Sequence, residues 1–340
     1  MRLLALFPDR LNPKGIAQFV GSALGEGWEV TGAGAADEDT DALTNADAML
    51  VALVEVDATA IDKAANLRFV QTPSHGFDHI DIEAAAARGV PVCNIGTSGA
   101  EAGVVAEHAF ALILACARRL VEGHEGIRAG EWPQLTGSSV ELLDKTLGIV
   151  GLGHIGCEVA KRARAFGMKL LYHDVTEAPE DIASELRLQR AELPELLGAS
   201  DVVTVHVPLM PATRGLIGAA ELAMLKPNAI FVNTSRGPVV DNTALAEAAD
   251  SGRIVAGVDV FDPEPPPVDH PLRSAHNVVL SPHVAGTTRE SVGRMMQAAF
   301  DNLQCFARGE KPRDVVNGIT ATAKAQPKPE ADASEERGET

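Results

Sequence analysis

Cysteine is scarce in this sequence, and its four cysteines follow no pattern. Disulfide frameworks and structural zinc sites need paired or regularly spaced cysteines, but Cys93, Cys116, Cys157 and Cys305 include no CxxC pair. Neither kind of site is therefore expected. The pattern predicts reduced, mostly buried thiols in a cytoplasmic protein.

Long apolar runs are missing as well. Residues 3–7 are apolar, but the run stops at Pro8 and is too short for the apolar region of a signal peptide, so a first strand is predicted there. The longest other apolar stretch, residues 104–117, contains Glu107 and His108. These polar groups disfavour a membrane span, and no membrane partner is expected.

Basic residues are outnumbered, with 29 Lys and Arg against 47 Asp and Glu and a net charge of -18. No basic cluster could neutralise a nucleic-acid backbone, so nucleic acid is not an expected partner. An anionic substrate would need a local cation to hold it against the acidic field. The 340 residues, 46% of them hydrophobic, suit two domains.

The clearest positive signal is the stretch of residues 147–156, an apolar run that ends in three glycines. It predicts a strand that turns into a helix over about residues 155–166. Gly151 suits a turn too tight for a side chain, Gly153 lets backbone N–H groups approach a pyrophosphate, and Gly156 lets helix and strand pack closely. The free N–H groups at the helix start would hold the phosphates.

An acidic residue follows at the expected spacing. A second apolar strand over residues 168–173 ends at Asp174, which lies 18 residues past Gly156. Such a carboxylate hydrogen-bonds the adenosine ribose hydroxyls. It repels a 2′-phosphate, and neither Val175 nor Thr176 supplies a cation, so the expected cofactor is NAD rather than NADP. This ordered context favours a dinucleotide site over a plain glycine turn.

Apolar runs alternate with helical stretches along the chain, which predicts an α/β fold of parallel sheets covered on both faces. Up to residue 94, elements are expected at residues 3–7, 15–24, 48–53, 59–65, 69–71, 82–88 and 91–94, followed by a long helix over residues 100–123. Later strands at 201–208, 229–233, 254–259 and 278–280 alternate with helices at 193–197, 219–225 and 243–251. These complete a doubly wound sheet, and a helix over 289–307 leads back to the first domain.

Three of the later strands end in complementary chemical groups, namely Arg236, Glu264 and His283. Ligands of doubly wound sheets lie beyond the carboxyl ends of the strands. Arg can clamp a substrate carboxylate with two parallel hydrogen bonds. His can exchange a proton with a carbonyl or alcohol oxygen, while a neighbouring carboxylate holds its ring. Beside a nicotinamide these groups fit hydride transfer, with His283 as acid and base, Glu264 positioning it, and Arg236 orienting the substrate.

Alternative roles for the polar residues are less favoured. Each of the three groups alone could be a solvated or core side chain, but their joint occurrence at strand ends favours a site. A serine hydrolase is disfavoured because Ser235 lacks the GxSxG elbow. His75 and His79 are four residues apart without a helix or further ligands, so no metal is expected.

These motifs together resemble the D-isomer-specific 2-hydroxyacid dehydrogenases, which include phosphoglycerate dehydrogenases and glyoxylate or hydroxypyruvate reductases. The resemblance runs from about residue 1 to residue 317. It rests on residues 151–156, 206–209, 233–237, 257–261, 264–265 and 281–283. It implies a Rossmann NAD-binding domain over residues 101–286, inserted into a flavodoxin-like substrate domain over 1–100 and 287–319. It also implies a homodimer, held largely through the cofactor domains.

The resemblance also extends the set of site residues. It implies cofactor contacts from Gly151, Gly153, His154, Ile155, Gly156, Asp174, His206, Val207, Pro208, Thr213, Thr234, Ser235, Asp259 and Gly286. It implies catalytic roles for Arg236, Glu264 and His283. The tail at residues 320–340 has no large apolar side chain and is expected to be disordered.

The substrate loop departs from the family pattern. Where the family has a glycine-rich turn that binds the substrate carboxylate, this chain has Pro73, Ser74, His75 and Gly76, of which the last three are expected to contact substrate. Thr72 stands where phosphoglycerate dehydrogenases commonly have arginine, so a small unphosphorylated 2-oxo or 2-hydroxy acid is expected. A D-3-phosphoglycerate dehydrogenase and a dinucleotide-sensing scaffold like the family's corepressors are the alternatives.

Overall fold

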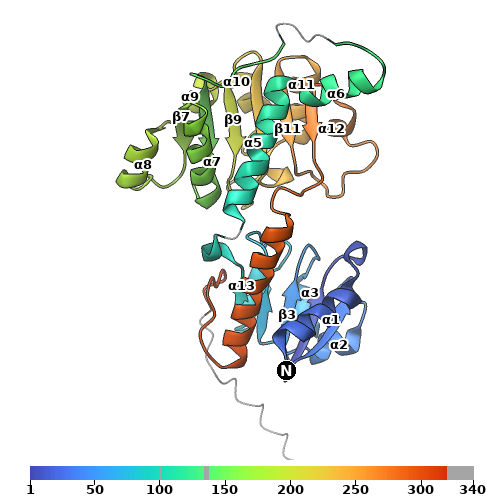
Figure 1. Cartoon of the computed structure of the whole chain (residues 1–340). Coiled ribbons are helices and arrows are strands. Elements are labelled where there is room, and N and C mark those ends of the chain that lie inside the picture. Colours follow the sequence, from blue (N-terminus) through green and yellow to red (C-terminus); the bar gives the residue numbers. More distant parts are fainter. Residues whose placement is uncertain (100, 134–137, 320–340) are drawn as a thin grey trace, which may run out of the picture. The chain divides into compact units, whose positions relative to one another are not determined.

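The computed structural model describes residues 1–99, 101–133 and 138–319. The chain divides into two compact units (Figure 1). Unit 1 contains residues 1–97 together with the segment from residue 296 onward, and unit 2 contains residues 98–295. The division falls within α13 (Arg289–Ala307). The tail at 320–340, for which disorder is expected, lies outside the described residues.

Unit 1 is built on a parallel sheet with the strand order β2-β1-β3-β4-β5. Its strands are β1 (Arg2–Leu6), β2 (Glu29–Ala33), β3 (Ala48–Val51), β4 (Phe69–Gln71) and β5 (Val92–Cys93). This is the order of flavodoxin-like sheets.

Helices cover both faces of this sheet. On one face, α1 (Pro13–Leu24) and α13 contribute Val20, Leu24, Phe300 and Leu303 to a shared core. The other face is covered by α2 (Thr40–Asn45), α3 (Ala58–Lys63) and α4 (Ile82–Ala87). Each of these three short helices starts after an aspartate whose side chain accepts a backbone N–H, which is a preferred helix cap.

Unit 2 is built on a second parallel sheet, with the order β12-β11-β10-β9-β6-β7-β8. Its strands are β6 (Thr146–Val150), β7 (Lys169–His173), β8 (Leu188–Arg190), β9 (Val202–Val205), β10 (Ala229–Asn233), β11 (Ile254–Val258) and β12 (Val278–Leu280). The order reverses between β6 and β9, as in dinucleotide-binding folds. The expected Rossmann domain is therefore confirmed.

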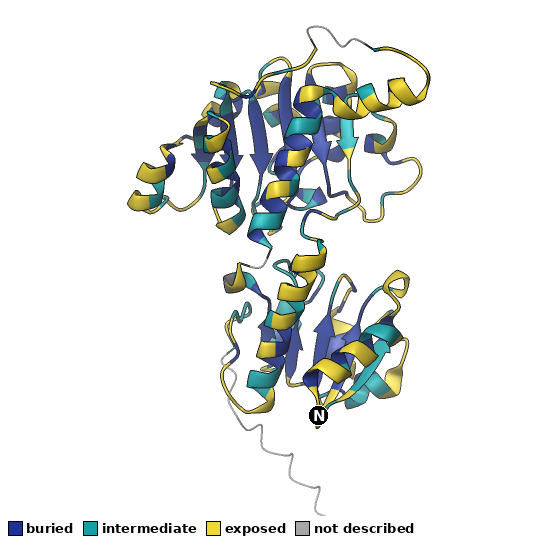
Figure 2. Ribbon diagram, viewed as in Figure 1, coloured by how far each residue is buried: buried dark blue, intermediate teal, exposed yellow. Residues whose placement is uncertain are grey.

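Helices cover both faces of the second sheet too. One face carries α5 (Ala102–Arg118), α7 (His154–Ala165) and α8 (Glu180–Leu186). The other carries α9 (Leu193–Ala199), α10 (Ala219–Met224), α11 (Asn242–Asp250) and α12 (Pro271–Ser274). Every residue of β9 and β10 is consequently buried (Figure 2). Burial on both faces explains why these strands are mostly apolar, with Thr204 and Asn233 as their polar residues.

The long helix expected over residues 100–123 is divided in the structure. It ends at Arg118, and Arg119 takes a left-handed conformation with φ of 52°. A separate helix, α6 (Leu120–Arg128), follows. The apolar pattern alone could not reveal this break, because both helices continue it.

The cysteines are unpaired thiols. Burial raises the pKa of Cys93 and of Cys116 to about 12, so both stay protonated. Within the described ranges, no group of three or more His, Cys, Asp or Glu side chains could hold a metal ion. No helix in the same ranges is long and apolar enough to cross a membrane.

Candidate active site

The carboxyl ends of the strands of unit 2 form one row. The parallel register aligns the terminal residues His173, Val150, Val205, Asn233, Val258 and Leu280. The segments that follow these residues therefore emerge at one edge of the sheet, where such folds bind ligands. That edge carries the predicted site residues of unit 2.

The glycine turn after β6 has the shape that the sequence predicts. Gly151 has φ of 94°, and a Cβ there would lie 2.8 Å from the carbonyl carbon of His206. A Cβ on Gly156 would lie 2.3 Å from the carbonyl oxygen of Gly151, whereas a Cβ on Gly153 would meet nothing within 4 Å. No side chain caps the start of α7 at His154. The helix N–H groups thus remain available to an anion.

Asp174 follows β7 and is held by hydrogen bonds. Its Oδ2 accepts the backbone N–H of Leu152 at 2.7 Å, and its Oδ1 accepts the backbone N–H and the hydroxyl of Thr176, each at 2.9 Å. Partial burial would raise the pKa of Asp174, but these hydrogen bonds lower it below its usual value. The carboxylate is therefore charged at neutral pH.

Two buried polar atoms at this edge lack partners among the described residues, namely Thr234 Oγ1 and His206 Nδ1. The other ring nitrogen of His206 contacts Thr204 Oγ1 at 2.9 Å. Burial lowers the pKa of His206 to about 3, so the ring is neutral. An orphaned buried polar atom is costly, which marks the ends of β9 and β10 as places where a polar ligand fits.

The remaining predicted cofactor residues of unit 2 lie on the segments after β6, β9, β10 and β12, and several bond within the protein. They are Ile155, Val207, Pro208, Thr213, Ser235 and Gly286. The Thr213 hydroxyl accepts the N–H of Met210, and the Ser235 hydroxyl donates to Asn233 Oδ1. These hydrogen bonds hold the turns that follow β9 and β10.

Asn233 organises the turn that carries Arg236. Its Oδ1 accepts the N–H of Ser235 at 2.9 Å, and its Nδ2 donates to the carbonyl of Arg236 at 3.0 Å. A Cβ on Gly237 would lie 1.9 Å from the carbonyl oxygen of Phe261. The absent side chain lets the turn after β10 pack directly on the loop after β11.

That second loop carries Glu264, which is bonded to His283. Glu264 Oε2 accepts from His283 Nδ1 at 2.6 Å, and Glu264 Oε1 accepts the N–H of Phe261 at 2.9 Å. The side chains of both residues are 32% exposed. The pair lies at adjacent strand ends, as the sequence predicts, and leaves His283 Nε2 as the ring nitrogen that can face a substrate.

Asp259, whose cofactor contact stays a prediction, anchors the loop of His283. Its fully buried carboxylate accepts the hydroxyl of Ser281 at 2.6 Å and the N–H groups of Val284 and Ala285 at 3.0 and 2.9 Å. Its carbonyl accepts the N–H of His283 at 2.8 Å. Burial would raise the pKa of Asp259, but its hydrogen bonds outweigh burial and lower that pKa to about 2.

His108 completes this anchor from α5. Its Nε2 lies 2.8 Å from Ser281 Oγ and 3.4 Å from Asp259 Oδ1. The Ser281 hydroxyl gives its only proton to the carboxylate, so His108 Nε2 must be the donor to the serine oxygen. From the sequence, His108 is expected to be only a partly buried polar residue in a helix. No local motif reveals its partners, which are more than 150 residues away.

In unit 1, the predicted substrate loop follows β4. Thr72 is buried, and its Oγ1 lies 2.9 Å from Ser74 Oγ. Ser74 donates to the carbonyl of Gly76 at 2.8 Å, and Asn94 Nδ2 donates to the carbonyl of His75 at 2.8 Å. The loop is therefore internally braced, and in this conformation Ser74 has no proton left to donate to a substrate.

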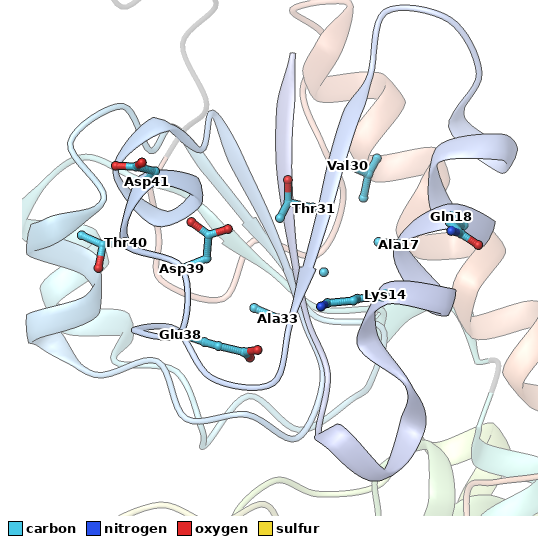
Figure 3. A pocket seen from close by; sticks show the side chains of 11 residues that line it. Lys14, Ala17, Gln18, Val30, Thr31, Ala33, Glu38, Asp39, Thr40 and Asp41 are labelled. Carbon is cyan, nitrogen blue, oxygen red and sulfur yellow. The ribbon is translucent and has the colours of Figure 1, made fainter.

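A hollow of about 660 Å³ lies elsewhere in unit 1. Figure 3 shows Lys14 and Gln18 from α1 on one side of it and Asp39 and Asp41 on the other. Asp39 already caps α2 by accepting the N–H of Ala42. Nothing in this hollow matches the chemistry at the strand ends of unit 2.

The edge of unit 2 fits a dinucleotide. The uncapped start of α7 suits a pyrophosphate, the carboxylate of Asp174 suits ribose hydroxyls, and the orphaned atoms of His206 and Thr234 suit a polar group farther along the edge. These features run from β7 to β10, across the point where the strand order reverses.

Comparison with known proteins agrees with this geometry. Residues 110–285 match the family model described as the D-isomer specific 2-hydroxyacid dehydrogenase, NAD binding domain. A glyoxylate reductase of Aeropyrum pernix is 44% identical over 281 residues, which cover 80% of this chain and 83% of that protein. A D-3-phosphoglycerate dehydrogenase of Archaeoglobus fulgidus is 39% identical over 77% of this chain and 50% of its own length.

A solved structure gives the same result. The NAD-dependent formate dehydrogenase of Staphylococcus aureus in complex with NAD superposes with a TM-score of 0.82 at 30% identity, covering 93% of this chain and 99% of that one. The cofactor is NAD, and the protein is an NAD-dependent oxidoreductase of 2-hydroxy acids. The chain belongs to the D-isomer specific 2-hydroxyacid dehydrogenase family.

Proposed function

We propose that the protein interconverts a small, unphosphorylated D-2-hydroxy acid and its 2-oxo acid, with Arg236, Glu264 and His283 as the catalytic residues. The observation that carries the proposal is the 2.6 Å contact between His283 Nδ1 and Glu264 Oε2. It lies at the sheet edge where the dinucleotide features are found. A histidine whose Nδ1 is held in this way can donate and accept a proton through Nε2.

The proposed roles are those predicted from the sequence, and the contact between His283 and Glu264 supports two of them. The hydride comes from the nicotinamide of bound NADH. In the direction of reduction, His283 Nε2 gives its proton to the carbonyl oxygen, and Glu264 stabilises the imidazolium through Nδ1. Arg236 binds the substrate carboxylate with its planar guanidinium and polarises the reacting oxygen. In the reverse direction, His283 takes the proton from the hydroxyl.

The substrate assignment rests on the loop after β4 and on the relatives. Thr72 is buried and hydrogen-bonded, so this position supplies no cation for a phosphate. The Aeropyrum pernix glyoxylate reductase is 44% identical to the chain, against 39% for the Archaeoglobus fulgidus D-3-phosphoglycerate dehydrogenase. Both points favour glyoxylate, hydroxypyruvate or pyruvate. Substrate contacts from Ser74, His75 and Gly76 stay a prediction from the sequence.

The test is a panel of 2-oxo acids assayed by NADH oxidation in wild type and in His283→Ala. Wild type should turn over glyoxylate, hydroxypyruvate or pyruvate faster than 3-phosphohydroxypyruvate. His283→Ala should lose about two to four orders of magnitude in turnover while its NADH affinity stays within about twofold. A preference for the phosphorylated acid would reverse the substrate assignment, and normal turnover in His283→Ala would remove His283 from the mechanism.

For the assembly, we propose a homodimer in the cytoplasm. The helix α6 is largely exposed (Figure 2). Apolar side chains are exposed on it and just beyond it: Leu120 by 65%, Ile127 by 53% and Trp132 by 77%. Such a concentration of exposed apolar residues favours a protein contact. The unpaired cysteines favour a reducing compartment.

A further inference from the structure

Three buried amide side chains form a network beside the loop after β4, and the proposed mechanism uses none of them. Gln71 is 0% exposed, Asn302 4% and Asn94 7%. Gln71 ends β4, Asn94 follows β5, and Asn302 lies in α13, 231 residues from Gln71. Because a buried amide is costly unless it is hydrogen-bonded, the partners of these side chains show what they hold in place.

Backbone groups fix the orientation of the Asn302 amide. Its Oδ1 accepts the N–H of Arg313 at 3.0 Å, and its Nδ2 donates to the carbonyl of Arg313 at 3.1 Å and to Gln71 Oε1 at 3.0 Å. Gln71 Nε2 in turn donates to the carbonyls of Thr72 and Asn94 at 2.7 and 3.1 Å. An amide nitrogen only donates and an amide oxygen only accepts, so neither side chain can reverse without losing these bonds.

Arg313 is itself held by the sheet of unit 1. The residues after it pair with β5, where Cys93 and Val315 form an antiparallel bridge and the N–H of Asn94 donates to the carbonyl of Asp314 at 3.1 Å. The backbone groups that orient the amide network therefore have a fixed place beside the sheet.

Gln71 holds the start of the loop after β4. The carbonyl of Thr72 accepts from Gln71, and the N–H of Ile95 donates to the carbonyl of Ser74 at 3.3 Å. With the bond from Asn94 to the next carbonyl, that of His75, three carbonyls of the loop are bonded to groups outside it. The loop thus has few carbonyl oxygens left to repel an anion.

Asn94 acts on the loop directly. Its Oδ1 accepts the N–H of Gly96 at 2.9 Å, and its Nδ2 donates to the carbonyl of His75 at 2.8 Å. In a trans peptide the carbonyl and the N–H point in opposite directions, so this bond turns the N–H of Gly76 away from Asn94. Within the described ranges the N–H of Gly76 donates to no group, and it is therefore available to a ligand.

We propose that Asn94 and Asn302 are positioning residues for the substrate, which keep the loop shaped to receive a carboxylate. Asn94 sets the direction of the N–H of Gly76, and Asn302 acts through Gln71 on the start of the loop. The inference rests on the proposed function, in which this loop contacts a 2-oxo acid. It gives α13 a part in substrate affinity but none in cofactor affinity, because the dinucleotide features lie on unit 2.

The test compares wild type with Asn94→Asp and Asn302→Asp, which keep the size of the side chains. In Asn94→Asp an oxygen replaces the nitrogen that faces the carbonyl of His75, so the peptide after His75 turns. In Asn302→Asp the donor to Gln71 is lost. The Gln71 amide then turns its nitrogen toward the new carboxylate and releases the carbonyl of Thr72.

The measurements are KM and kcat for glyoxylate and hydroxypyruvate, the dissociation constant of NADH, and that of oxamate, a non-reducible analogue of 2-oxo acids, from the NADH complex. We expect KM and the oxamate constant to rise at least about tenfold in Asn94→Asp and about three- to tenfold in Asn302→Asp, because a hydrogen bond to a carboxylate is misdirected. Since that bond is made in the ground and transition states alike, kcat should stay within about threefold and NADH affinity within about twofold.

Two controls separate positioning from a general loss of structure. Asn317 also holds backbone groups at β5, but outside the loop: it accepts the N–H of Val92 at 3.2 Å and donates to the carbonyl of Val90 at 2.8 Å. Asn317→Asp should lower stability in urea unfolding and leave KM unchanged. Asn66→Asp adds the same charge at an exposed site of unit 1 and should change neither.

The outcomes distinguish this inference from the proposed function. If KM and oxamate affinity stay within about twofold of wild type in Asn94→Asp and Asn302→Asp, or if Asn317→Asp raises KM as much as they do, the positioning role is refuted. If the wild type neither reduces the two acids nor binds oxamate, the proposed function fails, and the inference falls with it. Asn94→Ser, which removes the donor without adding a charge, repeats the test if the aspartate variants unfold.

Discussion

The candidate acid–base pair joins two side chains that are 19 residues apart in the sequence, with α12 and β12 between them. Glu264 makes two different contacts, to the ring of His283 and to the N–H of Phe261. The second contact fixes the carboxylate so that the first can orient the ring. Strand-end position alone identifies Glu264 and His283 as candidates, but only the structure shows which atoms meet.

Replacing Glu264 by glutamine should separate charge from shape. The amide oxygen can still accept the N–H of Phe261, but the imidazolium of His283 loses its charged partner. We expect turnover to fall by about 10- to 100-fold and NADH affinity to stay nearly constant. Asp269→Asn, which neutralises an exposed acid in the same loop, is the matched control and should be silent. Equal turnover in both variants would contradict the proposed role.

His206 makes a prediction about stability. Burial lowers its pKa to about 3 from an ordinary value of 6.5, so between these values the unfolded chain binds a proton that the folded chain does not. Its contribution therefore makes stability fall as pH drops from about 6.5 toward 3, by at most about 1.4 kcal/mol per pH unit. His206→Gln should flatten that slope in urea unfolding at pH 5, 6 and 7. If the free energy of unfolding depends on pH equally in the two proteins, protonation of His206 does not destabilise the fold and the prediction is wrong.

At the scale of elements, the loop after β12 depends on the end of β11. Asp259 holds the loop through Val284, Ala285 and Ser281, while His283 sits in a left-handed conformation with φ of 53°. That conformation is unfavourable for a residue with a side chain and needs such support. The orientation of His283 therefore depends on the buried carboxylate of Asp259 and on the three groups that donate hydrogen bonds to it.

Asp259→Asn tests this requirement. An amide nitrogen would oppose one of the N–H or O–H donors, so we expect a loss of about 3 kcal/mol in stability and at least about tenfold in turnover. Ser281→Ala removes one donor only and should cost clearly less. In wild type the depressed pKa of Asp259 stabilises the fold above about pH 3.9, and this contribution disappears as pH falls through about 2. An Asp259→Asn protein with normal turnover would show that the loop holds itself.

The success of sequence-based prediction differs between central and edge elements. β9 and β10 lie in the middle of their sheet, so all of their side chains are buried and form apolar runs that are easily recognised. β2 and β8 are edge strands with mostly exposed or half-buried side chains, and no strand is predicted at either position. The contacts of His108 are missed for a related reason, because packing of α5 on the sheet brings Ser281 and Asp259 to it.

For the whole molecule, the alternation of apolar runs predicts both parallel sheets, and the strand orders confirm the fold class. The assembly is different, because packing within one chain does not reveal it. The helix α6 follows Arg119, whose backbone is in the left-handed conformation. Its apolar side chains Leu120 and Ile127 are exposed to solvent. In a chain with a net charge of -18, such residues need a reason to remain exposed.

The proposed dimer supplies that reason, and charged substitutions on α6 test it. Leu120→Glu combined with Ile127→Glu places two more acids at the proposed contact, where the copies would bring like charges together and bury them. We expect light scattering to give twice the chain mass for wild type and the single chain mass for this variant. Val268→Glu is the control, because Val268 is 88% exposed and lies in the loop between β11 and α12, and it should remain dimeric. A monomeric wild type, or a double variant that stays dimeric, would place the contact elsewhere and leave the apolar residues of α6 unexplained.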